Sequence, residues 1–156
     1  MKNNSWLIVG AVMAVLVAIF LISCGKEAVP APGTTPTASI LSGATMTAAI
    51  DDNNRPIDPT DVFPIDAEWF LCSVRINNAP PNTELRAEWT YVGGEVEEEL
   101  GKNYVFDIYY ETIEGTGYIC LVQPRPFTGY EWPRGDFEIV LYVDDEEILS
   151  VPFEVK

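Results

Sequence analysis

Carboxylates are the most abundant groups in this chain that could do chemistry, and histidine is absent. The 156 residues include 24 Asp and Glu, 9 Lys and Arg and no His, which gives a net charge of −15. Two carboxylates placed across a glycosidic bond can hydrolyse it, but no spacing in the sequence singles out such a pair. The lack of histidine excludes a Ser-His-Asp triad and every His-based metal site. We therefore expect no enzymatic activity and no cofactor, with a carboxylate-based hydrolase as the least favoured alternative.

Asp and Asn residues between positions 51 and 61 carry enough oxygen atoms to hold a hard cation such as calcium. The oxygens belong to Asp51, Asp52, Asn53, Asn54, Asp58 and Asp61. Their spacing is not that of an EF-hand loop, and clusters of Asp and Asn commonly form turns. We therefore predict a turn here and no metal site. The acidic run at Glu95 and residues 97–99 is expected to be a solvated loop.

Cys24 stands at the end of an apolar run near the start of the chain. Lys2 precedes the run, residues 6–22 are uncharged and largely apolar, and Ser23 is a small residue just before the cysteine. This layout is that of an export signal. The run is also nearly long enough to cross a hydrocarbon core, so an uncleaved transmembrane anchor remains an alternative.

The segment Leu21-Ile22-Ser23-Cys24 resembles the lipobox of bacterial lipoprotein signals. The resemblance implies cleavage before Cys24, diacylation of its thiol and acylation of the new terminus. More than one acyl chain is needed for stable anchoring, because a single chain holds only marginally. We therefore expect an extracytoplasmic protein that is lipid-anchored to the cell membrane, or to the outer membrane if the cell has one.

Composition divides the chain into three segments. We predict a signal peptide over residues 1–23, the lipid-attachment cysteine with a tether over 24–42, and one domain over 43–156. The tether is rich in Pro, Thr, Ala and Gly and offers nothing for a core, so we expect it to be semi-extended. The remaining length suffices for one domain with a hydrophobic core.

Apolar residues alternate with polar ones along most of the predicted domain, which is the pattern of half-buried β-strands. We expect strands over residues 70–76, 85–91, 104–110, 118–122, 137–143 and 149–155, and a weaker one over 45–50. Turn-forming residues at 77–82, 93–94, 114–117 and 144–146 are expected to separate them. About seven amphipathic strands predict two antiparallel sheets packed face to face. Three of the expected apolar faces matter below, namely Trp89 with its neighbours, Tyr104-Phe106-Ile108-Tyr110, and Tyr118-Cys120-Val122.

Cys72, Trp89 and Cys120 resemble the Cys-Trp-Cys core of immunoglobulin domains, and Tyr118-Ile119-Cys120 is similar to the Tyr-x-Cys of the tyrosine corner. The last two strands resemble the closing hairpin of prokaryotic Ig-like or fibronectin-III-like modules. The resemblance implies an all-β, Ig-like antiparallel sandwich behind the N-terminal signal or anchor helix. Cys72 and Cys120 are also an even pair in an exported protein, so we predict a disulfide. The alternative is two buried free thiols.

Aromatic and basic residues gather between positions 123 and 134, among prolines and a glycine. They are Arg125, Phe127, Tyr130, Trp132 and Arg134. Exposed aromatic and guanidinium groups suit contact with a protein or a sugar, so this segment is the candidate binding loop. The alternative is that Phe127 and Trp132 fold back and close the end of the sandwich.

Together these observations predict a lipid-anchored cell-envelope protein that displays an Ig-like domain for binding or interaction, without catalysis. The expected partners are the membrane, through the lipid on Cys24, and an envelope protein or glycan. Nucleic acid is not expected, because an acidic surface repels phosphates. The alternative function is a structural accessory subunit of a larger envelope complex.

Replacing Cys24 with serine tests the lipid signal. We expect Cys24→Ser to abolish labelling by a fatty-acid probe and to block signal cleavage, because the thiol is the group that receives the lipid. Probe incorporation and gel mobility in intact cells measure both effects. Cys120→Ser is the matched control and should label like the parent. Equal labelling of Cys24→Ser and the parent would show that the lipobox interpretation is wrong.

Overall fold

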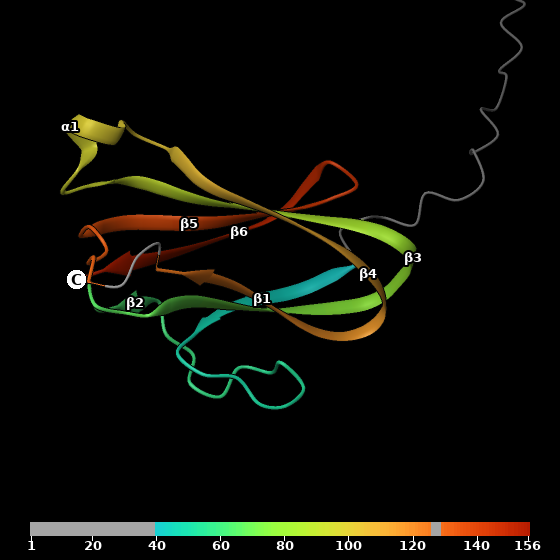
Figure 1. Ribbon diagram of the computed structural model, residues 1–156. Helices are drawn as coiled ribbons and strands as arrows, with labels where there is room; N and C mark the ends of the chain where they lie inside the picture. The colour runs from blue at the N-terminus through green and yellow to red at the C-terminus, as the bar shows by residue number, and fades with distance from the viewer. Residues whose placement is uncertain (1–39, 126–128) are drawn as a thin grey trace, which may run out of the picture. The chain divides into compact units, whose positions relative to one another are not determined.

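Six strands and one short helix make up the part of the chain that the computed structural model describes, residues 40–125 and 129–156. They are β1 (Leu41–Thr47), β2 (Val62–Phe63), β3 (Trp69–Gly94), α1 (Glu97–Leu100), β4 (Tyr104–Pro124), β5 (Gly135–Val143) and β6 (Glu146–Val155). The strands form one curled sheet in the order β1-β3-β5-β6-β2, and β4 pairs with β3 (Figure 1). All pairings are antiparallel except that of β2 with β6.

The all-β prediction is confirmed, but the arrangement of the strands differs from the expected one. The six described strands belong to a single sheet that curls over its own core, in place of about seven strands in two sheets. The predicted signal, the tether up to residue 39 and Cys24 lie outside the described residues. Within residues 40–125 and 129–156, no helix has the length and apolar character needed to span a membrane.

β3 continues through residues 77–82, where we predicted a turn between two strands. Asn78 and Asn82 have φ angles of 46° and 62°, a left-handed conformation that Asn tolerates better than most residues. Pro80 and Pro81 lie between them. The chain therefore bends sharply without ending the strand, and the two halves of β3 run back over each other (Figure 1).

β4 bends together with β3, so the predicted hairpin at 114–117 is also wrong. Gly115 has a φ of 70° and lies opposite Ala79 in the register. The backbone N–H of Asn78 donates to Oγ1 of Thr116 over 2.9 Å, which joins the two bends. The true β3–β4 connection is residues 95–103. It contains α1, a single turn without buried residues where we had expected an acidic loop.

The core lies inside the fold-over and is dominated by aromatic rings. The Phe70 ring lies 4.3 Å from Trp132, 4.8 Å from Phe153 and 5.1 Å from Phe63, measured between centroids. Trp89 packs beside this cluster and is 1% exposed, as its strand pattern predicted.

The predicted β5–β6 turn is confirmed, and Asp144 and Asp145 have the positive φ angles that tight hairpin turns require.

Trp89→Ala should be strongly destabilising. The indole fills the interior between the two halves of β3, and its removal should lower the free energy of unfolding by about 3–5 kcal/mol. A typical domain has only about 5–15 kcal/mol in total, so the variant should be marginal at growth temperature. Trp69→Ala is the matched control, because Trp69 is 48% exposed. Denaturant unfolding measures both, and equal midpoints for the two variants would contradict this account of the core.

Candidate functional site

The outer edge of β4 is the longest unpaired strand edge in the part of the chain that the structure describes. β4 pairs with β3 along nearly its whole length, from Tyr104 opposite Tyr91 to Pro124 opposite Trp69. No other described strand pairs with its far side. Such an edge presents a row of N–H and C=O groups to any other extended chain.

A β-bulge near the start of β4 decides which side chains face inward. β4 has one residue more than β3 between the pairs Trp89–Asp107 and Thr90–Val105, and the extra residue is Phe106. Its ring points to the core, 6.1 Å from Trp132 and 6.0 Å from Phe137. Beyond a bulge the alternation is shifted by one residue.

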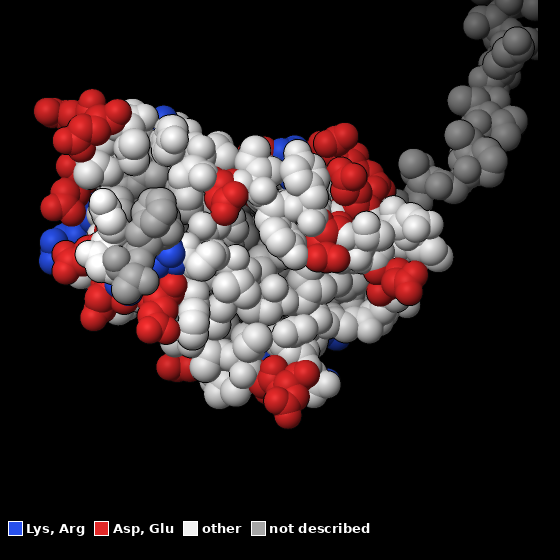
Figure 2. All heavy atoms as spheres, in the orientation of Figure 1, with Lys and Arg blue, Asp and Glu red and all other residues white. Residues whose placement is uncertain are grey.

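The shift overturns the predicted apolar face of this strand. Asp107, Tyr109 and Glu111 are the register partners of Trp89, Ala87 and Leu85, and so share the inner side of the sheet with them. Ile108 and Tyr110 lie opposite Glu88 and Arg86, on the outer side. These two side chains are 45% and 59% exposed, and Val105 is 40% exposed. Figure 2 shows the face that β4 crosses in Figure 1, which is largely uncharged with separate acidic groups in and around it.

The inner side of the edge is acidic and opens into a hollow. The Tyr109 hydroxyl donates to Oε2 of Glu111 over 2.7 Å, and this hydrogen bond raises the pKa of the tyrosine. The hollow has a volume of about 500 Å³ and lies where β4 bends, between residues of its two halves such as Tyr109, Glu111, Gly117 and Ile119. The inner side of the edge is therefore accessible from outside.

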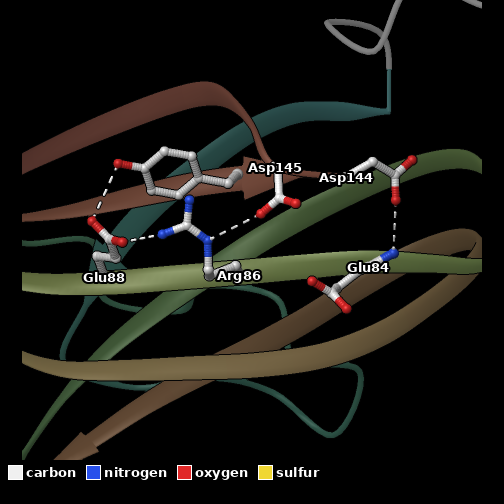
Figure 3. Close-up of polar contacts among 6 residues, drawn as sticks. Glu84, Arg86, Glu88, Asp144 and Asp145 are labelled. Carbon is white, nitrogen blue, oxygen red and sulfur yellow. Dashed lines mark hydrogen bonds and ion pairs between the residues drawn. The ribbon is translucent and has the colours of Figure 1, made fainter.

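A polar cluster lies on the outer side of β3, around Arg86 (Figure 3). Arg86 forms an ion pair with Glu88, and its guanidinium carbon lies 3.7 Å from the centre of the Tyr142 ring. The Tyr142 hydroxyl donates to Oε2 of Glu88 over 3.2 Å. Burial, followed by the Glu88 charge, raises the Tyr142 pKa. Nε of Arg86 has no hydrogen-bond partner, and the Asp145 carboxylate is 3.9 Å away.

This cluster joins β3 to β5 and supports the strand edge. Arg86 is paired in the register with Tyr142 on one side and with Tyr110 of β4 on the other. The backbone N–H of Glu84 also donates to the Asp144 carboxylate over 3.1 Å, which ties the β5–β6 turn to β3 (Figure 3). These contacts hold the outer side of β3 and β5 in place next to β4. Periodicity in the sequence could not reveal it, because its residues come from strands that are far apart in the chain.

The predicted binding loop is mainly structural in its described part. Trp132 is buried against Phe70, and its Nε1–H donates to the Ala67 carbonyl over 2.9 Å. Arg125 donates to the Asp66 carbonyl over 3.1 Å, and the Arg134 backbone N–H donates to the Glu95 carboxylate. Tyr130 is largely exposed, and Phe127 lies outside the described residues. The structure does not bring the four described residues of this loop together as a site, and Trp132 closes the end of the core.

The acidic cluster at residues 51–61 forms turns. The Asp51 carboxylate accepts the backbone N–H groups of Asn53 and Arg55, each over 2.8 Å. These bonds, led by that from Arg55, lower the pKa of Asp51. No group of three or more metal-binding side chains occurs in the described parts of the chain.

The two cysteines of the domain leave the sheet on different sides. Cys72 lies opposite Leu121 and faces the core, whereas Cys120 lies opposite Ser73 on the outer side. Ser73 Oγ donates to the Asn54 carbonyl over 2.6 Å, which shows that the 51–58 turn covers that side. Both thiols are free, so the predicted disulfide is corrected. Neighbouring strands in this register direct the two side chains apart.

Comparisons with known proteins identify no family for this chain. No family model matches the chain, and no curated protein matches it. Among solved structures, the chain is similar to the alkylpurine DNA glycosylase AlkC of Pseudomonas fluorescens, bound to DNA containing an abasic site analogue. The TM-score is 0.42 and the identity 15%, over 72% of this chain and 30% of the glycosylase chain. The matched region is thus under a third of that protein.

This comparison corrects three predictions made from the sequence. They are the display function on a lipid anchor, the lack of enzymatic activity, and the exclusion of nucleic acid from the partners. The finding against them is that the similar structure is a DNA-bound enzyme. A likeness this weak does not assign enzymatic activity or DNA binding to the present chain, so neither is carried over to it.

The free thiols can be counted in a Cys24→Ser background, where only Cys72 and Cys120 remain. We expect two titratable thiols after denaturation without reductant, because the side chains lie on different sides of the sheet. Burial raises the pKa of both thiols, but Cys120 is only half-buried, so in the native protein it should react faster than Cys72. Burial raises the Cys72 pKa to about 12, so almost no thiolate forms at pH 8. Recovery of no thiol from denatured protein would instead establish the disulfide.

Proposed function

We propose that the described domain binds an extended polypeptide segment by strand addition to the free edge of β4. The observation that carries the proposal is the edge itself, because β4 pairs on one side only among the described strands. In strand addition, main-chain hydrogen bonds supply affinity and alternate side chains supply specificity. The proposal rests on geometry and does not require a lipid anchor.

The backbone groups of the edge are suitably directed near Ile108. The N–H of Ile108 donates to the Asp107 carboxylate over 2.8 Å. Because N–H and C=O groups alternate in direction along an antiparallel strand, we infer that those of Ile108 and Tyr110 point away from β3. An incoming strand would replace the Asp107 contact with a main-chain hydrogen bond.

The first half of β4 is the more accessible part. In the second half, the Tyr118 carbonyl accepts a hydrogen bond from Nδ2 of Asn54 over 3.3 Å, so the 51–58 turn occupies the edge there. The first half instead has the exposed apolar side chains Val105, Ile108 and Tyr110. Ordering an extended chain has an entropic cost, and these side chains supply apolar contact area that offsets it. We therefore place the docking edge at residues 104–112.

Location and family kinship are separate proposals, and both rest on the sequence. The lipobox at residues 21–24 supports export and acylation of Cys24. Kinship with prokaryotic Ig-like or fibronectin-III-like modules is supported by the core tryptophan Trp89 and by the β5–β6 hairpin at the end of the chain.

Proline at position 108 tests strand addition. Peptides selected on the full chain from a library of random nine-residue sequences serve as the probe. Ile108→Pro removes an N–H that points away from β3, so we expect the fold to survive and binding to fall at least tenfold. Ile108→Ala is the matched control. It keeps the N–H and should weaken peptide binding less than Ile108→Pro does. Fluorescence polarisation measures binding, and denaturant unfolding checks the fold.

Hydrogen exchange keeps the test decisive if the proline variant does not fold. Bound peptide should slow exchange of the Ile108 and Tyr110 amides in the parent protein, because they become part of a ladder. Peptides that bind the parent and the folded Ile108→Pro variant equally, or that leave both amides unprotected, would overturn the proposal.

A further inference from the structure

We infer that the segment that adds to β4 is basic on one face and apolar on the other, with Lys or Arg at two positions four residues apart. This inference rests on the proposed function and names the chemistry of its partner. It follows from the side chains that the bulge at Phe106 places on each side of the edge.

The inner side of the edge sets the basic positions. Asp107 and Glu111 lie four residues apart, about 13 Å along an extended strand, with Tyr109 between them. Residues directly opposite each other on neighbouring strands lie close together, so unlike charges stabilise the pair and like charges destabilise it. The partner residues opposite Asp107 and Glu111 should therefore be cationic.

The charges on this side are not neutralised within the described parts of the chain. The ion pairs found there involve Arg86, Lys102 and Lys156, and none includes Asp107, Glu111 or Glu114. Glu111 and Glu114 both line the hollow of about 500 Å³, whose lining contains no Lys or Arg. A long basic side chain opposite Glu111 could extend into this hollow and meet both carboxylates.

The outer side of the edge sets the apolar positions. Ile108 and Tyr110 are exposed there beside the braced Arg86. The two partner residues opposite them fall between the basic positions, one next to each of them. The expected pattern is thus basic, apolar, any residue, apolar, basic.

A second copy of this chain fits the edge poorly. Two β4 strands paired antiparallel about Tyr109 would place Asp107 of each copy opposite Glu111 of the other. Like charges would meet twice at one interface, between chains that each carry a net charge of −15. The charge pattern therefore favours a basic partner over self-association.

Three synthetic peptides test the pattern on the full chain. Each carries a five-residue core between serine flanks, namely Lys-Val-Thr-Val-Lys, Glu-Val-Thr-Val-Glu, or the rearranged Lys-Lys-Val-Thr-Val. We expect the first to bind at least tenfold more tightly than the other two, with an affinity that falls as salt is raised. The rearranged peptide separates the spacing from the total charge.

Charge reversal on the protein completes the test. Asp107→Lys with Glu111→Lys should reverse the preference, so that the glutamate peptide binds more tightly than the lysine peptide. Glu146→Lys with Glu147→Lys makes the same change of net charge on the β5–β6 hairpin and should keep the original preference. Equal reversal by both double variants would show a general charge effect and overturn the inference.

The remaining outcomes separate this inference from the proposed function. If the three peptides bind equally and Ile108→Pro weakens all of them, strand addition stands and the basic pattern is wrong. If no peptide binds the parent, including library-selected ones, both proposals fail. Sedimentation that shows a parent dimer, absent in Ile108→Pro, would identify a second copy as the occupant and overturn the inference.

Discussion

The shared bend of β3 and β4 is the constraint on which the rest of this structure depends. Asn78, Asn82 and Gly115 adopt left-handed backbone conformations at the same level of the two paired strands. Because neither strand ends there, one hairpin supplies both walls of the core. β1 then pairs with the first half of β3 and β5 with the second, both on the side away from β4. The bend thus leaves β4 without a second strand partner among the described strands.

The bulge at Phe106 is the second feature that determines the site. It decides which side chains of the β4 edge face inward and which face outward. Without the extra residue, the alternation in residues 104–110 would bury Ile108 and Tyr110. With it, Phe106 joins the aromatic core, Asp107 and Glu111 lie on the inner side, and Glu111 lines the hollow. One inserted residue therefore gives the edge its acidic inner side and its apolar outer side. Any change that removes the bulge should reverse the two sides.

The sequence predicted correctly those strands in which apolar and polar residues alternate so that only one face can be buried. The strands around Trp89, Phe137 and Phe153 have one apolar face each, and all three side chains are buried. The bends at 77–82 and 114–117 were not predictable, because Asn, Pro and Gly favour a sharp bend and a reversal alike. The predicted apolar face Tyr118-Cys120-Val122 is wrong for another reason. Residues 118–122 are apolar at nearly every position, so the pattern did not show that Leu121 is buried and Val122 is exposed.

The candidate site was harder to predict than the core, because it consists of the backbone groups of β4 that no other described strand pairs with. An exposed edge with apolar side chains risks uncontrolled association, and charged residues beside the edge are a common protection. Asp107 has this position here, since its carboxylate already accepts the Ile108 N–H that an incoming strand would need. The same carboxylate repels a second acidic copy and attracts a basic segment. Protection and selectivity therefore follow from one arrangement, in which a partner strand must both displace the Asp107 contact and compensate its charge.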